Sequence, residues 1–231
     1  MKQLILLVGL ISAAFPALGF AADAPPAAAG TTAASPATGA AAAPGGTAKT
    51  QAKTGTAAAS PAAGGASPQV QVVTSMGSFI IELNAERAPL TVPHFLKYVD
   101  QGHYSGTIFH RVIANFVIQG GGFDKDYKPK PAPAKVVNES GNGLTNVRGT
   151  VGMARSEDPH GSDAQFYVNL YDNEALDPNQ TRWGYAVFGK VIQGMDVVDK
   201  IGNVVTTTHG PFKDTPVQPV VIERIERVPA P

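Results

Sequence analysis

The chain has 231 residues, of which 43% are hydrophobic, a formal net charge of +0 and no cysteine. Without a net positive charge or a basic stripe, nucleic-acid binding has no electrostatic support, and membrane-surface contact by the folded part has none either. Because no disulfide can form, the stability of the fold has to come from an ordinary apolar core.

The first 21 residues have the pattern of a secretory signal peptide. Lys2 supplies a positive start, residues 4–18 are apolar, and Gly19 and Ala21 are small residues at positions that a signal peptidase reads. An uncleaved membrane anchor is the alternative, because only Ser12 interrupts the apolar stretch; the small-residue end favours cleavage near Ala21. The signal peptide predicts export, so we expect a periplasmic protein. Without a cysteine there is no lipidation site, so a lipoprotein is excluded.

Residues 22–68 have a different composition. They consist almost entirely of Ala, Gly, Pro, Ser and Thr, with no Leu, Ile, Val or aromatic residue to bury. Recurring Pro and Gly interrupt the alanine runs, so we expect a disordered linker. Two interpretations stay open: a tether that holds the domain away from a membrane, and a tolerated insertion without a role.

From residue 69 onward the pattern is that of a β-rich domain, expected to span 69–231. Residues 70–74 and 79–83 flank a turn that contains Gly77, which predicts a hairpin. Thr91 can cap a helix that ends before Gly102 and has apolar residues at i, i+3, i+4 and i+7. Those apolar residues are Val92, Phe95, Leu96 and Val99.

An arginine lies within the next β-rich stretch. Residues 109–113 and 116–119 predict two short strands around a corner, and the second run ends in three glycines. Arg111 is unusual in this apolar setting, because a guanidinium is rarely buried without a partner. Either it pairs with a nearby acid, Asp124 or Asp126, or it faces a functional site.

The rest of the domain predicts further short strands and one more helix. Residues 123–149 are typical of a loop. Strands are expected at 150–154, 165–170, 186–191 and 220–227, and a short amphipathic helix at 194–201. Many short strands with two helices predict a mainly β fold, a closed antiparallel barrel capped by the helices.

Several blocks of the sequence resemble the cyclophilin family of peptidyl-prolyl cis/trans isomerases. Phe-His-Arg-Val-Ile followed by Phe-Val-Ile-Gln-Gly-Gly-Gly-Phe lies within 109–123, and further similar blocks lie at 149–155, 164–169 and 184–191. The resemblance covers about residues 69–228. It implies an eight-stranded barrel, isomerisation of X-Pro bonds in proline-containing polypeptides, help in the folding of exported proteins, a monomer, and no cofactor or metal.

The resemblance also implies roles for individual residues. Arg111 would place a cation near the nitrogen of the twisted amide, with Phe116 and Gln119 as further catalytic residues. The implied substrate-binding residues are Val117, Ala154, Arg155, Gln165, Tyr167, Leu176 and Tyr185. By spacing alone, Phe116, Tyr167 and Leu176 are equally compatible with plain barrel core.

Four positions depart from the best-known eukaryotic pattern of the family. Ala175 stands where Trp is frequent, Tyr185 where His is usual, Arg155 where Asn is and Val117 where Met is. These variations resemble those of exported bacterial members. Since the missing Trp removes an indole donor and a large contact surface, we expect weak binding of cyclosporin.

Two other functions are alternatives. A non-catalytic module or holdase could bind proline peptides on the same barrel, but a pure binder has no need of Arg111, Phe116 and Gln119 together. A barrel for a small apolar ligand is disfavoured by Gln119 and Gln165. The histidines lack the paired spacing of a metal site, and His110 is interpreted as a hydrogen-bonded core histidine.

Overall fold

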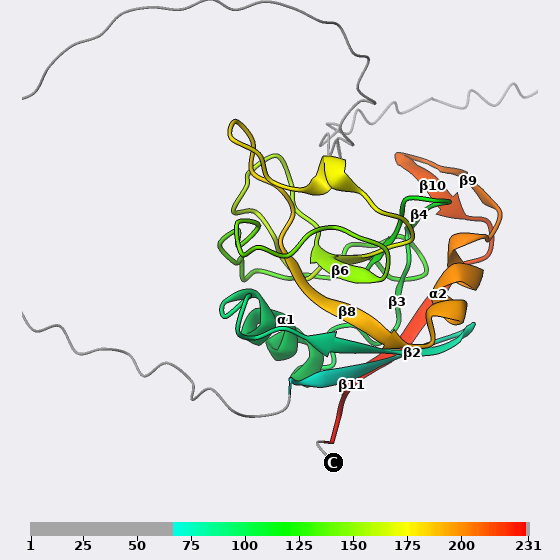
Figure 1. Ribbon diagram of the computed structural model, residues 1–231. Coiled ribbons are helices and arrows are strands. Elements are labelled where there is room, and N and C mark those ends of the chain that lie inside the picture. The colour runs from blue at the N-terminus through cyan, green and yellow to red at the C-terminus, as the bar shows by residue number, and fades with distance from the viewer. Residues whose placement is uncertain (1–66, 230–231) are drawn as a thin grey trace, which may run out of the picture.

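The structure is a computed structural model that describes residues 67–229 (Figure 1). The signal peptide expected at 1–21 and the linker expected at 22–68, apart from its last two residues, lie outside the described residues. Pro68 is already attached to the domain, because its carbonyl oxygen accepts a hydrogen bond from Leu83 N at 2.8 Å.

A nine-stranded sheet forms the body of the molecule. Its strands are β1 (Gln69–Thr74), β2 (Gly77–Leu83), β3 (Thr107–Ile108), β4 (Arg111–Ile113), β5 (Val117–Gly120), β6 (Thr150–Met153), β7 (Phe166–Asn169), β8 (Val187–Gln193) and β11 (Val221–Val228). They lie in the order β3-β11-β1-β2-β8-β6-β7-β5-β4, and every pairing is antiparallel. The predicted hairpin is formed by β1 and β2. The mainly β, antiparallel fold is confirmed.

The sheet has nine strands where eight were expected, because β3 and β4 are separate short strands, and its two edges meet without a regular ladder. Its edge strands β3 and β4 are not ladder partners, and only Phe109 and His110 separate them along the chain. Ile108 N donates to Phe123 O at 2.9 Å, and Gly121 N donates to Ile108 O at 3.4 Å. These two bonds link the edge at β3 to the segment that follows β5, because no regular ladder spans that corner.

Two helices pack on different sides of the curled sheet, α1 (Thr91–Asp100) and α2 (Met195–Gly202) (Figure 1). Thr91 was expected to cap the N-terminus of α1, and this prediction is wrong. Thr91 is the first helical residue, and the Glu139 carboxylate accepts hydrogen bonds from Leu90 N, Thr91 N and Thr91 Oγ1 at 2.6–3.1 Å. A carboxylate at a helix N-terminus satisfies free N–H groups and complements the helix dipole. This cap comes from 48 residues further along the chain.

Four elements were not predicted, one of which is the two-residue strand β3. A separate hairpin is formed by β9 (Thr206–His209) and β10 (Phe212–Pro216), and η1 (Glu174–Leu176) is a single 3-10 turn. All four residues of β9 are exposed, so its sequence has no apolar alternation to reveal a strand. The hairpin lies beside β4, which carries Arg111 (Figure 1).

The barrel interior is filled by an apolar cluster, the barrel core. Phe95 of α1 contacts three aromatic rings in it, with ring centroids 5.3 Å from Tyr104, 5.8 Å from Phe166 and 5.1 Å from Phe188. All four side chains are at most 1% exposed. In residues 67–229, no helix is both long and apolar enough to cross a membrane.

Candidate active site

The sheet register brings the predicted site residues into one row. Arg111 of β4 pairs with Gln119 of β5, Gln119 pairs with Tyr167 of β7, and Tyr167 pairs with Gly152 of β6. Directly paired residues of adjacent strands have side chains on the same face. Arg111, Gln119 and Tyr167 are therefore neighbours on one face, although 56 positions separate the first from the last in sequence numbering.

Hydrogen bonds join Arg111 to Gln119 and Gln119 to Gln165. Arg111 Nη1 donates to Gln119 Oε1 at 3.5 Å, and Gln119 Nε2 donates to Gln165 Oε1 at 3.3 Å. Gly122 makes room for this arrangement, because a Cβ at that residue would lie 2.6 Å from Gln165 Cδ. The glycine run thus allows close approach of the Gln165 side chain.

A second apolar cluster, the site cluster, is distinct from the barrel core. Its buried members are Val117, Ala154, Tyr167 and Leu176, and the half-buried Phe116 and Tyr185 pack against them. These six residues were all expected to bind substrate or to act in catalysis. The interpretation of Phe116, Tyr167 and Leu176 as plain barrel core is wrong, since none of them belongs to that cluster.

Buried amide side chains that were not predicted from the sequence form hydrogen bonds with residues of the site cluster. Tyr167 donates its hydroxyl proton to Asn146 Oδ1 at 2.5 Å, and Asn169 Nδ2 donates to the same oxygen at 3.2 Å. Asn173 Nδ2 donates to Asn169 Oδ1 at 2.7 Å and to Phe116 O at 2.9 Å. Since buried amides need several partners at fixed positions, this network holds Phe116 and Tyr167 in place.

Arg111 has no carboxylate partner at ion-pair distance within residues 67–229. Burial lowers the pKa of its half-buried guanidinium, and the charge of Asp214 on β10 opposes that shift. The expected local partners are engaged elsewhere: Asp124 accepts backbone N–H groups of its own loop, and Asp126 pairs with Lys125. The predicted local salt bridge is therefore wrong, and no carboxylate within residues 67–229 forms an ion pair with Arg111.

His110 differs from the hydrogen-bonded core histidine expected from the sequence. Its side chain is buried against Phe123, with ring centroids 4.7 Å apart, but Nδ1 has no hydrogen-bond partner. Burial, aided by the charge of Arg111, lowers the pKa of His110 to about 4. The ring is neutral at pH 7, so it adds no second positive charge beside Arg111.

Arg155 lies at the edge of the site cluster. Its guanidinium carbon is 4.7 Å from the centroid of the Tyr185 ring, a cation-π geometry. The preceding residue, Ala154, is a buried member of the cluster, and its N–H donates to Gln165 O at 3.0 Å. Within residues 67–229, no group of three or more His, Cys, Asp and Glu side chains is placed to hold a metal ion.

The fold and the site together define a β-barrel that presents apolar side chains beside a cation and two glutamines, an arrangement suited to a proline-containing peptide. Residues 69–227 match the family described as cyclophilin type peptidyl-prolyl cis-trans isomerase/CLD. The chain belongs to this family. It is accordingly a peptidyl-prolyl cis-trans isomerase, as the resemblance implied, and it acts on proline-containing peptides.

Curated relatives support the assignment. The chain is 53% identical over 159 residues to the peptidyl-prolyl cis-trans isomerase cyp18 of Streptomyces antibioticus. The matched region covers 67% of this chain and 95% of that protein. It is 46% identical over 155 residues to peptidyl-prolyl cis-trans isomerase B of Escherichia coli K12, covering 66% and 94%. A crystal structure of a Cryptosporidium parvum cyclophilin matches with a TM-score of 0.59, at 24% identity, over 71% of this chain and 99% of that one. That last likeness supports the fold alone.

Proposed function

We propose that this isomerase acts on exported polypeptides, and that Arg111 supplies the electrostatic part of catalysis. Rotation about a peptide bond has a barrier of about 18–20 kcal/mol, because amide resonance is lost in the twisted state. In that state the proline nitrogen is pyramidal and carries a free lone pair. A fixed N–H donor with a positive charge stabilises this state more than either planar isomer.

The single observation that carries the proposal is the half-buried Arg111 guanidinium, bonded to Gln119 and without a carboxylate partner in the part of the chain that the structure describes. A guanidinium is always charged, and its donors have fixed directions. Partial burial strengthens its field on a bound amide, since the effective dielectric constant is lower than in water. Gln119 orients Arg111 through one oxygen and has two N–H groups, of which Gln165 takes one. The second N–H is available to a substrate carbonyl.

The apolar part of the site suits the proline ring. Phe116 and Tyr185 are half-buried and pack against the buried Val117, Tyr167 and Leu176. Contact with these side chains removes apolar surface of the proline from water, worth about 25 cal/mol per Å². The proline is then held while the preceding carbonyl group rotates, and no covalent bond breaks.

The direct test is a protease-coupled isomerase assay of the full chain with short X-Pro peptides. Arg111→Ala should lower kcat/KM by about 10²- to 10³-fold, as expected for the loss of one donor that acts in the transition state. Arg227→Ala is the matched control, because this exposed arginine pairs with Asp100 away from the site. A wild-type protein that binds proline peptides without isomerising them would favour the holdase alternative.

Export, cleavage near Ala21 and a monomeric state are part of the same proposal. Export and cleavage are supported by the apolar segment at 4–18 and by the small residues that follow it. Fractionation of bacteria that express the full chain should place the protein in the periplasm, with its N-terminus at Ala22, and size measurements should give one chain. A cytoplasmic protein that keeps Met1 would contradict export.

A further inference from the structure

The Arg155 guanidinium has several backbone partners but no carboxylate partner among residues 67–229. It donates only to backbone carbonyl oxygens, those of Gly184 (3.4 Å), Ser156 (3.0 Å), Glu157 (3.4 Å) and Trp183 (3.1 Å). Within residues 67–229 it forms no ion pair, whereas Arg148 and Arg227 each bond to both oxygens of an aspartate. Carbonyl dipoles fix the position of Arg155, but a net positive charge remains.

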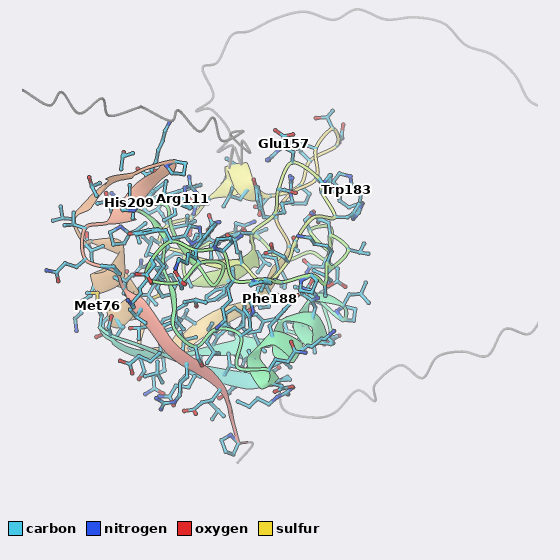
Figure 2. All side chains as sticks on the ribbon, turned by 180° about the vertical axis from the view of Figure 1, so that it is seen from behind. Met76, Arg111, Glu157, Trp183, Phe188 and His209 are labelled. Carbon is cyan, nitrogen blue, oxygen red and sulfur yellow. The ribbon has the colours of Figure 1, made fainter. Side chains whose placement is uncertain are left out.

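The acidic groups nearest in sequence do not serve as partners for Arg155. Asp158 Oδ1 accepts the His160 N–H at 2.9 Å, within its own loop. The Glu157 side chain is exposed and lies toward the outer end of the molecule, near the exposed Trp183 (Figure 2). On the neighbouring segment, Asp177 Oδ1 accepts hydrogen bonds from Asn146. The Arg155 charge is thus available to a ligand.

The position of this charge relates it to the substrate. Arg155 lies 4.7 Å over the Tyr185 ring, and Tyr185 packs on the site cluster. On the chain, Arg155 follows Ala154, whose N–H is bonded to Gln165 O beside the Gln119 side chain. A peptide with its proline on the site cluster and its backbone on Gln119 places a neighbouring residue within reach of this guanidinium.

We propose that Arg155 gives the enzyme a preference for substrates with a carboxylate side chain, Asp or Glu, in one of the two positions before the proline. The proposal rests on the proposed use of this site for X-Pro peptides. A carboxylate accepts two N–H donors of a guanidinium in a bidentate arrangement. Because the guanidinium is half-exposed, the preference should be modest, about two- to five-fold in kcat/KM over a neutral residue.

The test compares matched peptides on the full chain. Two peptide series are assayed with Xaa as Glu, Gln and Lys: acetyl-Ala-Xaa-Pro-Phe-4-nitroanilide and acetyl-Xaa-Ala-Pro-Phe-4-nitroanilide. The acetyl group is neutral, so the side chain of Xaa is the only charge that differs between peptides. In at least one series, kcat/KM should follow the order Glu, Gln, Lys, and the spread should shrink as salt rises from 20 mM to about 0.5 M. Equal values for the three residues in both series, with activity intact, would overturn the proposal but leave the isomerase function standing.

Variants separate charge from structure. Arg155→Gln should remove the Glu-to-Gln ratio, whatever it does to overall activity, while Arg155→Lys should keep part of that ratio because it keeps the charge. Arg227→Gln removes one positive charge from an exposed pair elsewhere and should leave the ratio unchanged. A ratio that survives Arg155→Gln would overturn the proposal.

The sole tryptophan of the chain gives a second readout that does not depend on catalysis. Trp183 is 49% exposed, and its carbonyl accepts a hydrogen bond from Arg155. Titrating the same peptides, as amides without nitroanilide, should change Trp183 fluorescence at lower concentration for Glu than for Lys. If no peptide were isomerised, this titration would still decide the charge preference, and only the isomerase function would fail.

Discussion

The barrel core and the site cluster are both apolar, but they are built differently. Every member of the barrel core is buried, and Phe95 contacts the rings of Tyr104, Phe166 and Phe188. The Tyr104 hydroxyl donates to a backbone oxygen, that of Ala164, and not to another side chain. The site cluster is smaller and half-exposed at Phe116 and Tyr185, and its position depends on buried amides such as Asn146. The core is therefore buried throughout, while the site cluster is partly exposed and is positioned by polar groups.

Strand β7 contributes alternate side chains to the two regions. Phe166 and Val168 belong to the barrel core, whereas Tyr167 between them belongs to the site cluster. Successive side chains of a strand point to opposite faces, so one strand serves both regions. Changes to one face should alter stability with little effect on chemistry, and changes to the other should alter activity as well.

The largest expected effect on stability comes from the core. Phe188→Ala removes a fully buried ring and should lower the free energy of unfolding by about 3–5 kcal/mol. Urea denaturation measures this loss. The activity per folded molecule should stay close to wild type, because Phe188 belongs to the barrel core and not to the site cluster. A large drop in activity per folded molecule would break the distinction between the two regions.

His110, which is buried beside Phe123 and Phe212, should make stability depend on pH. Its pKa is about 4 in the folded protein and about 6.5 in the unfolded chain, mainly because burial disfavours the charged ring. Below pH 6.5 the unfolded chain binds a proton that the folded protein does not, so stability falls as pH falls from about 6.5 to 4. The loss from this group is at most about 3 kcal/mol.

The matched variant for that measurement is His110→Phe. Its stability should lack this share of the pH dependence, and it also removes the unpartnered Nδ1. The buried His103 has a pKa lowered in the same direction, by burial, so the difference between wild type and His110→Phe isolates His110. Parallel curves of unfolding free energy against pH for the two proteins would contradict the assignment.

A smaller loss of stability, with a marked loss of activity, is expected from Gly152→Ala. A Cβ at this position would overlap the Tyr167 ring and hydroxyl group, so the ring has to move. We expect a cost of about 1–3 kcal/mol in stability and up to about 10²-fold in kcat/KM, because small displacements in a site have large effects on rate. Gly141→Ala is the control, since nothing lies within 4 Å of a Cβ there. Equal activities for the two variants would place Tyr167 outside the catalytic arrangement.

The sequence predicted the parts of the fold that have a periodic apolar pattern. These include the first hairpin, both helices, the strand that contains Arg111 and the strand that follows it. It did not predict β9, because Thr206–His209 is exposed throughout. The Glu139 cap and the contact between Asn146 and Tyr167 also escaped prediction, since they join residues far apart in the chain and lie partly in loops without periodicity. The site side chains were identified by resemblance to a family, and their grouping into a separate cluster required three-dimensional structure.

The central claim is that Arg111 stabilises the twisted amide more than it binds the planar substrate. Equilibrium exchange NMR on acetyl-Ala-Gln-Pro-Phe-amide measures isomerisation without a protease, and Trp183 fluorescence measures binding in the same sample. For Arg111→Ala we predict a dissociation constant within about three-fold of wild type and a catalysed exchange rate lower by about 10²-fold or more. Unchanged exchange, or a loss fully matched by weaker binding, would contradict the claim.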